Sequence, residues 1–396
     1  MDILEGLKRY RLFQPAVDDA EVIYRNAVVR IDSHNAFMGI NMFRKKINFC
    51  NFPFLWGIFT LFFFTYLMIE TAYWYRQEIE KVLMTVTTFG FSIQMSSKIY
   101  TFILTRKRIL EVNQMNLDYF QLDVVKSTSV KKALQRSSSL THILVTISLF
   151  TYHILAGIVA TGPMVLGLAT SNKLLPLGVE VLHSDSWIAY FVNYLMQFNL
   201  CYYGAFLTTT SEAAYILFVL TATGHIDAII GLLDELQDMT KKRVDEAKVS
   251  EQLFKVLQIH QYHQHYMRKI VDLFQVYFLL AIASLYSCVT ISLASFVLIN
   301  WYIGMVVVFF ASFQIFFMCF LGTHLQMKND QLMTVVGSFA WFALPVRDQK
   351  QAILFLAATQ RPISPTAVLG ILNVETFLKI YKSVYSMLMV LLRVKV

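Results

Sequence analysis

Residues that could perform chemistry are sparse in this chain of 396 residues, and their spacing matches no common catalytic pattern. The sequence lacks a glycine-rich dinucleotide fingerprint, a phosphate loop, a CxxC pair and an HExxH zinc motif. One histidine cluster, His260, His263 and His265, lies in a segment with helical periodicity. His260 and His263 would share a helix face and could bind a metal, but His265 would not join them. A polar or protonatable packing surface is the simpler interpretation.

Two ionisable residues, Lys98 and Glu212, fall inside long apolar segments, away from the segment ends. A membrane enzyme would need several such groups converging at one depth. These two are the only ones, and both are predicted to lie toward the cytosolic side. We therefore expect no enzyme activity and no catalytic residue, and we also expect neither a metal nor a cofactor.

Polar residues recur along one face of the last apolar segment, at steps of three and four: Lys379, Lys382, Ser386, Met389 (an apolar member) and Arg393. The opposite face is wholly apolar and consists of Ile380, Val384, Met387 and Leu391. A membrane-spanning helix must turn a polar stripe toward protein or water. A water-filled pore with Met389 as an apolar constriction would meet this demand. Snorkelling of the lysines and Arg393 to the two membrane interfaces would meet it as well.

Aromatic and aliphatic side chains concentrate in the outer halves of the second, third, fourth and sixth apolar segments. They include Met84, Thr88 and Phe91, then Phe150, His153, Ile154 and Gly157, then Tyr190, Tyr194 and Phe198. Small, mostly apolar pockets with few polar groups suit small organic ligands. Ordinary helix packing with an interfacial aromatic belt is the alternative interpretation.

The composition identifies the elements that must position these residues. Hydrophobic residues make up 56% of the chain and charged residues 15%, against about 25% charged in soluble domains. A bilayer core about 30 Å thick requires roughly 20 apolar residues per helix. Seven segments qualify, at about residues 47–69, 79–104, 140–169, 187–223, 270–299, 301–325 and 368–392. The sequence therefore predicts an all-α membrane protein with seven transmembrane helices.

The loop charges predict the orientation. Residues 1–46, 105–139 and 224–269 contain eight, seven and seven basic residues, whereas the loops at 70–78 and 170–186 contain one each. The positive-inside rule then predicts a cytosolic N-terminus and an extracellular C-terminus. The net charge of +8 is thus a topology signal, and we expect no nucleic-acid partner.

The expected organisation has six successive parts. They are a cytosolic N-terminal segment (1–46), spans one to four with a ligand pocket (47–223), cytosolic helical extensions of spans four and five (224–269), spans five and six (270–325), a cytosolic anchor segment forming the first half of helix seven (326–367), and a pore-lining last helix (368–396). The anchor segment contains an amphipathic stretch broken by Pro345. Counting it as an eighth span would move Arg347, Lys350 and Arg361 to the wrong side.

The end of the chain, residues 338–392, resembles the C-terminal signature of the insect odorant receptor family. The matching elements are Trp341 with Pro345, then Gln360, Arg361 and Pro362, then Phe377, and finally the pair Tyr385 and Ser386. The Thr-Tyr-x5-Gln-Phe ending of gustatory receptors is missing from residues 384–393, and the loop at 224–269 is shorter than that of the odorant co-receptor. The chain therefore resembles a variable, ligand-tuning subunit.

The resemblance implies an odorant receptor subunit that gates a non-selective cation channel together with the odorant co-receptor. It implies a heterotetramer in the plasma membrane, expected in the ciliary dendrites of olfactory sensory neurons, with a small volatile odorant and membrane lipid as the other partners. Carried onto this chain, the ligand contacts would be Met84, Thr88, Phe91, Phe150, Ile154, Tyr194 and Phe198. The pore or gate would be formed by Ser386, Met389, Leu392 and Arg393, and the subunit anchor by Trp341, Pro345, Phe377 and Tyr385.

Arg393 departs from the family pattern, whose constriction is mainly apolar or neutral. An arginine from every subunit would disfavour cations, so Arg393 favours a mixed tetramer. The alternatives are a gustatory-type homomeric channel, a metabotropic seven-helix receptor and a transporter. The missing Asp-Arg-Tyr and Asn-Pro-x-x-Tyr motifs argue against a G-protein-coupled receptor.

Overall fold

The computed structural model describes residues 19–44, 51–367 and 370–393, and almost all of them are helical. The α-helices are α2 (Ala20–Ala36), α3 (Phe52–Trp74), α4 (Ile79–Leu104), α5 (Arg106–Phe120), α6 (Thr128–Thr170), α7 (Trp187–Lys241), α8 (Glu246–Ile299), α9 (Tyr302–Ser338), α10 (Val346–Thr359) and α11 (Val374–Arg393). Two short 3-10 helices, η1 (Asp123–Lys126) and η2 (Trp341–Ala343), and an antiparallel pair of two-residue strands, β1 (Thr366–Ala367) and β2 (Gly370–Ile371), complete the described elements.

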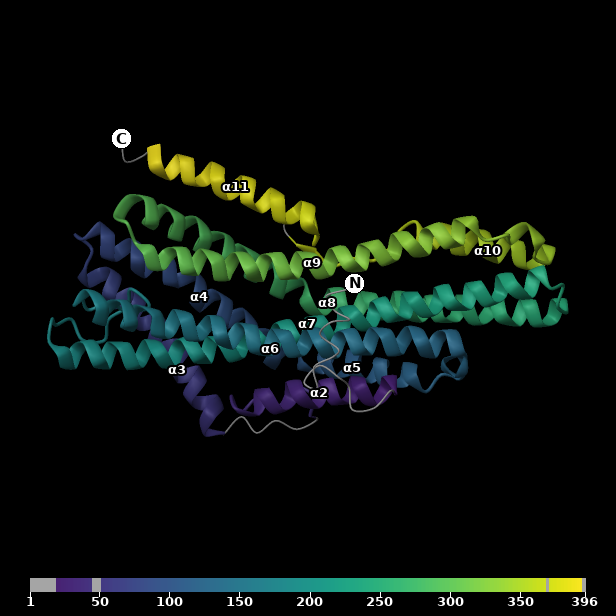
Figure 1. The fold of residues 1–396 in the computed structure, drawn as a ribbon, viewed down its shortest axis with the longest axis horizontal. Helices are drawn as coiled ribbons and strands as arrows, with labels where there is room; N and C mark the ends of the chain where they lie inside the picture. Colours follow the sequence, from purple (N-terminus) through teal and green to yellow (C-terminus); the bar gives the residue numbers. More distant parts are fainter. Residues whose placement is uncertain (1–18, 45–50, 368–369, 394–396) are drawn as a thin grey trace.

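Among the described residues, five helices are long and apolar enough to cross a membrane: α3, α6, α7, α8 and α9. The other two predicted spans are α4 and α11, which also run lengthwise in the bundle (Figure 1). Charged residues lower the mean hydropathy of both helices, since α4 contains Glu80, Lys81 and Lys98, and α11 contains Lys379 and Lys382. The predicted all-helical membrane fold is confirmed by this architecture together with the comparisons reported below.

Helices α7 and α8 are much longer than a bilayer requires. They contain 55 and 54 residues, which corresponds to about 80 Å each at about 1.5 Å per residue. Helix persists through the stretch 224–269, apart from a turn between Lys241 and Glu246. Figure 1 shows α7, α8 and α9 continuing past α3 and α4 toward α10 at one end of the molecule. Helices α7 and α8 therefore run on through the stretch that the sequence assigns to extensions of spans four and five.

Each of the seven apolar segments predicted from the sequence overlaps a helix, but the helix does not always have the predicted length. The second predicted span coincides with α4. Helix α6, in contrast, begins at Thr128, twelve residues before the predicted start of the third span at residue 140. Lys131, Lys132 and Arg136 are good helix formers, so the helix extends beyond its apolar part. Hydropathy locates the segment inside the membrane and does not report where a helix ends.

Helix α7 forms the centre of the bundle, with almost every side chain from Leu207 to Ile229 buried. Small residues allow its neighbours to approach closely. At Gly224, for example, an added Cβ would lie 2.7 Å from the Ser137 Cβ of α6. In the part of the chain that is described, α7 packs against α2, α3, α4, α5, α6, α8 and α9, and it therefore determines where the side chains of these helices converge.

Helix α11 lies at the edge of the bundle against α8 and α9 (Figure 1). Its buried face contains Ile380 and Val384, and the Tyr381 hydroxyl donates a hydrogen bond to Ser312 of α9. The hairpin formed by β1 and β2 precedes it, so that α11 begins at Val374 rather than at the predicted residue 368. Residues 368 and 369 lie outside the described chain.

Candidate ligand-binding site

A cavity lies between α4, α6, α7 and α9, the same four helices that the sequence singled out as its second, third, fourth and sixth spans. It encloses about 590 Å³ of atom-free space, including its mouth. Its lining residues are Phe91, Gln94, Met95, Ala156, Val159, Leu177, Leu200, Cys201, Gly204, Ala205, Thr208, Val307 and Phe310. We call it the inner cavity.

The inner cavity is mostly apolar, with two aromatic side chains, Phe91 and Phe310, and few polar groups. Gln94 and Thr208 supply the hydrogen-bonding capacity, and Cys201 is a free thiol. A pocket of this type binds a neutral, largely apolar molecule by contact area and orients it through one or two hydrogen bonds.

A buried polar network adjoins the inner cavity and connects four helices. Gln94 of α4 donates to Gln314 of α9 at 2.7 Å, and Gln314 donates to Glu212 of α7 at 3.0 Å. Tyr277 of α8 donates to the same carboxylate oxygen at 3.0 Å. Lys98 donates from Nζ to Thr208 Oγ1 at 2.6 Å. Because Gln94 and Thr208 also line the cavity, a ligand there would contact this network directly.

The two charged members of the network are fully enclosed, with Lys98 1% and Glu212 0% exposed. Ionisable residues inside membrane helices are costly and mark functional positions. The sequence predicts that both residues lie toward the cytosolic side, but it does not connect them. The structure brings them together through Thr208, which is one helical turn from Glu212 and bonded to Lys98. Sequence reasoning missed this arrangement because the contacts join helices more than one hundred residues apart.

The roof of the inner cavity is the connection between α6 and α7, residues 171–186, which has neither helix nor strand. We call it the roof segment. Its Leu177 lines the cavity. The buried amide of Gln197 accepts from the Leu177 backbone N–H at 2.7 Å and donates to the Val179 carbonyl at 2.5 Å. Asn193 accepts from the backbone N–H groups of Val181 and Leu182. The segment is therefore held by side chains of α7.

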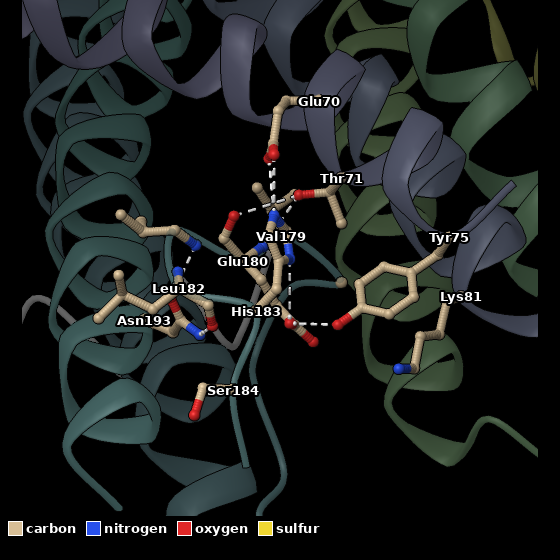
Figure 2. A network of polar contacts seen from close by, with 12 residues as sticks. Glu70, Thr71, Tyr75, Lys81, Val179, Glu180, Leu182, His183, Ser184 and Asn193 are labelled. Carbon is tan, nitrogen blue, oxygen red and sulfur yellow. Dashed lines mark hydrogen bonds and ion pairs between the residues drawn. The ribbon is translucent and has the colours of Figure 1, made fainter. Parts of the chain in front are cut away.

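The outer side of the roof segment carries a polar cluster, shown in Figure 2. The His183 ring nitrogen Nε2 lies 2.8 Å from Glu70, and Nδ1 lies 3.4 Å from Glu180. Tyr75 donates to Glu180 at 2.7 Å. Burial and the adjoining Glu180 carboxylate raise the pKa of Tyr75 above its usual value, so the phenol stays protonated.

The predicted ligand contacts are distributed over several environments. Phe91 lines the inner cavity, whereas Met84 lines a second cavity above the roof segment. Thr88 is buried and donates to the Thr85 carbonyl at 2.7 Å. Tyr194 is buried and donates to the Ala160 carbonyl, and Phe198 packs its ring against Tyr202.

Phe150 and Ile154 face away from the cavity, with exposed fractions of 52% and 62%. The face of α6 that lines the cavity contains Ala156 and Val159 instead. The prediction selected the larger side chains of this helix, but lipid solvates large apolar residues as well as a protein interior does. The small residues at close helix contacts were the signal that could have identified the inner face.

The predicted pore residues lie at the open side of α11. Ser386, Met389 and Arg393 are exposed and Leu392 is half-buried, while Ile380 and Val384 are covered by α8 and α9. Met387, predicted to belong to the apolar stripe, is 44% exposed. The structure thus leaves the polar stripe of the last helix facing away from its own bundle.

The predicted anchor residues do not form one cluster. Trp341 lines a cavity between α9 and α10 near Phe339 and Phe355, and Pro345 precedes α10 directly. Phe377 packs on Tyr381 and Phe316, and Tyr385 is exposed on α11. The histidines of α8 are separated too: His260 packs on Phe355, and His263 lies near His225. The described residues contain no group of three potential metal ligands.

Fold and site define a multi-pass helical membrane protein with a largely apolar cavity among four of its helices. Residues 78–385 match the sequence model of the 7tm Odorant receptor family, so the chain belongs to this family. The resemblance deduced from the C-terminal motifs is thereby confirmed, and the protein is a receptor rather than an enzyme.

Solved structures agree with this assignment. The olfactory receptor OR5 from Machilis hrabei superimposes with a TM-score of 0.76, and its complex with eugenol with a TM-score of 0.74. In both comparisons the sequence identity is 16%, and the match covers 95% of this chain and 100% of the other. At this identity the likeness establishes a shared fold.

Proposed function

We propose that this chain is the ligand-binding subunit of an odorant-gated, non-selective cation channel. The observation that carries the proposal is the inner cavity, an apolar chamber between four membrane helices with a polar network on its wall. Membership of the odorant receptor family supports an odorant as its occupant.

The chemistry of the inner cavity favours a neutral, mostly apolar volatile with one hydrogen-bonding group. Eugenol, the ligand in the related OR5 complex, is such a molecule. Phe91 and Phe310 would contact the ring or chain of the ligand, and Gln94 or Thr208 would bond its polar group. A charged ligand is disfavoured because its desolvation would have no matching free charge in the wall.

The gate in this proposal is α11. The stripe containing Ser386, Met389 and Arg393 is left open by its own bundle and would face the pore of a tetramer formed with the odorant co-receptor. Odorant opens the channel if it binds the open form more tightly than the closed form. The N-terminus is cytosolic and the C-terminus extracellular in this arrangement, in the plasma membrane of olfactory dendrites.

The proposal is tested by whole-cell recording from cells that express this chain with and without an odorant co-receptor, during pulses of eugenol and other volatile aromatics. A rapid inward current that requires both subunits and survives G-protein block is expected. Current from this chain alone would make it a homomeric channel. A response lost under G-protein block would identify a metabotropic receptor.

The pore assignment has its own test. Arg393→Gln should raise calcium permeability or conductance of the mixed channel, because it removes positive charge from the ion path. Lys255→Gln serves as the control, because Lys255 lies on the extension of α8, outside the polar stripe of α11, and is paired with Glu251 at 2.7 Å. Unchanged permeation in Arg393→Gln would place that residue outside the pore.

A further inference from the structure

Two cavities meet at the roof segment. The second, which we call the outer cavity, encloses about 720 Å³ of atom-free space including its mouth. Its lining residues are Thr71, Tyr75, Lys81, Met84, Lys173, Leu174, Leu175, Leu177, Gly178, Glu180, Trp301 and Ile303. Leu177 lines both cavities. The wall between them is therefore a single stretch of chain around this residue.

The wall is held in place by a few polar contacts rather than by regular structure. Gln197 makes two hydrogen bonds to its backbone, and Thr85 of α4 donates to the Gly178 carbonyl at 2.6 Å. Gly178 lies so close to α4 that an added Cβ would be 2.6 Å from the Met84 Cβ. Irregular segments with few buried contacts open at lower free energy than packed helices.

The outer side of the wall is closed by the cluster around His183. The imidazole stacks on Trp74 with ring centroids 4.9 Å apart and bonds Glu70 (Figure 2). Thr71 exchanges two hydrogen bonds with the backbone of Glu180 at 3.2 Å. All these contacts join the roof segment to α3, so the segment is fastened at its far end as well.

The lining of the outer cavity suits transient binding of the same ligands before they reach the inner cavity. The cavity has three charged lining residues, Lys81, Lys173 and Glu180. The rest of its lining includes apolar side chains such as Met84 and Trp301. Lys81 Nζ already lies 3.7 Å from the Tyr75 ring centroid. A neutral molecule with one polar group could place its apolar part on this surface and leave its polar group near the charges.

We propose that the outer cavity is an access site for the odorant, and that ligand passes into the inner cavity when the Leu177 stretch of the roof segment swings aside. This inference rests on the proposed function and adds the route and its gate. Gln197 is a positioning residue, because it lines neither cavity and acts only by holding the backbone of Leu177 and Val179.

Gln197→Met tests the gate, because methionine keeps the length of the side chain but cannot replace both bonds. Losing two backbone hydrogen bonds should raise the open fraction of the wall about tenfold. Association and dissociation of eugenol should both accelerate by that factor, and the equilibrium midpoint should stay unchanged. The rates are read from the rise and decay of current during rapid eugenol pulses.

The matched control is Gln252→Met, which removes an amide that donates to Glu235 at 3.2 Å, at the far end of α8. Its rates should equal those of the unaltered receptor. A changed midpoint in Gln197→Met, caused by a change in only one of the two rates, would mean that Gln197 shapes the inner cavity, and it would overturn the gate.

Ile303→Trp tests the route, because it narrows the outer cavity without touching the inner one. Both rates should fall together. Tyr302→Trp, at an exposed neighbouring position, is the control. Unchanged rates in Ile303→Trp would overturn the access site and favour lateral passage from the membrane into the inner cavity.

Exchange of radiolabelled eugenol on the purified receptor separates this inference from the proposed function. Faster exchange in Gln197→Met without any odorant-evoked current would preserve the access route and overturn the channel function. Normal currents with exchange rates that neither variant alters would overturn the access route alone. Failure of eugenol and of a series of alcohols from butanol to decanol to bind would overturn both.

Discussion

At the scale of single residues, the orientation of α6 decides which side chains could meet a ligand. Ala156 lines the inner cavity, whereas Ile154, two positions earlier, faces outward. We predict that Ala156→Phe fills the cavity and raises the odorant concentration for half-maximal current about tenfold or more, because excess volume in a packed site is costly. Dose–response curves with a fixed odorant measure the effect.

Ile154→Phe is the matched control, since it adds a ring at an outward position on the same helix. Its dose–response curve should overlay that of the unaltered receptor. If Ile154→Phe impairs the response and Ala156→Phe leaves it unchanged, the cavity does not hold the odorant.

The buried charges near the cavity support a second prediction at this scale. Lys98→Met removes the positive member of a fully enclosed network and leaves Glu212 without a compensating charge. Breaking such an arrangement costs about 3 kcal/mol. We expect a lower thermal midpoint and poor surface expression, measured on detergent-solubilised receptor by size-exclusion chromatography after heating.

Glu212→Gln in the same chain should restore much of the lost stability, because it removes the uncompensated charge and keeps acceptor capacity for Tyr277 and Gln314. Additive losses in the double variant would show that the two charges do not interact, and that Lys98 acts through Thr208 alone.

At the scale of the elements, the long helices α7 and α8 bury histidines in their extensions. Burial lowers the pKa of His260 to about 4 and of His263 to about 3, and both precede the apolar span expected at 270–299. His225 of α7 lies beside His263, with ring centroids 6.1 Å apart, so a proton on one ring would disfavour a proton on the other. These rings stay neutral in the folded protein.

The sign of the pH dependence follows from these pKa values. Above the ordinary histidine pKa of 6.5 the rings are neutral whether the chain is folded or unfolded, and the stability is complete. Below 6.5 the unfolded chain binds protons first, so stability is lost until the folded rings titrate near 4 and 3, at a cost of about 3 kcal/mol for His260 and roughly 5 kcal/mol for His263. We predict a falling thermal midpoint between these values in purified receptor.

His263→Phe should flatten this pH dependence, and His265→Phe should not, because His265 is exposed on the same helix. An identical slope in both variants would assign the acid sensitivity to other groups.

At the scale of the whole molecule, charge distribution predicts the orientation in the membrane. The basic residues concentrate in the N-terminal segment and in the connections near α5 and between α7 and α8, which the positive-inside rule assigns to the cytosol. We predict that an epitope at the N-terminus is stained only after permeabilisation, whereas one at the C-terminus is stained in intact cells. The opposite staining pattern would contradict the predicted topology and the exposure of the roof segment to the outside.

Long apolar runs and loop charges sufficed to predict the spans, because helices in lipid must satisfy their own backbone and each therefore leaves a local signal. The match of α4 to residues 79–104 illustrates this. The sequence also predicted the two faces of α11, since Ile380 and Val384 of the apolar face are buried and Ser386 of the polar stripe is exposed. The sequence could not predict the polar network, because Gln94, Gln314 and Glu212 come from three helices that are distant along the chain.

The sequence by itself determined the helical membrane fold and the family. Only the tertiary structure decided which face of each helix points inward, as Ala156 and Ile154 show. The physical reason is that lipid and protein interior are equally apolar, so hydrophobicity does not distinguish a lipid-facing side chain from a cavity-facing one. That distinction depends on which helices approach closely, and therefore on packing across the whole bundle.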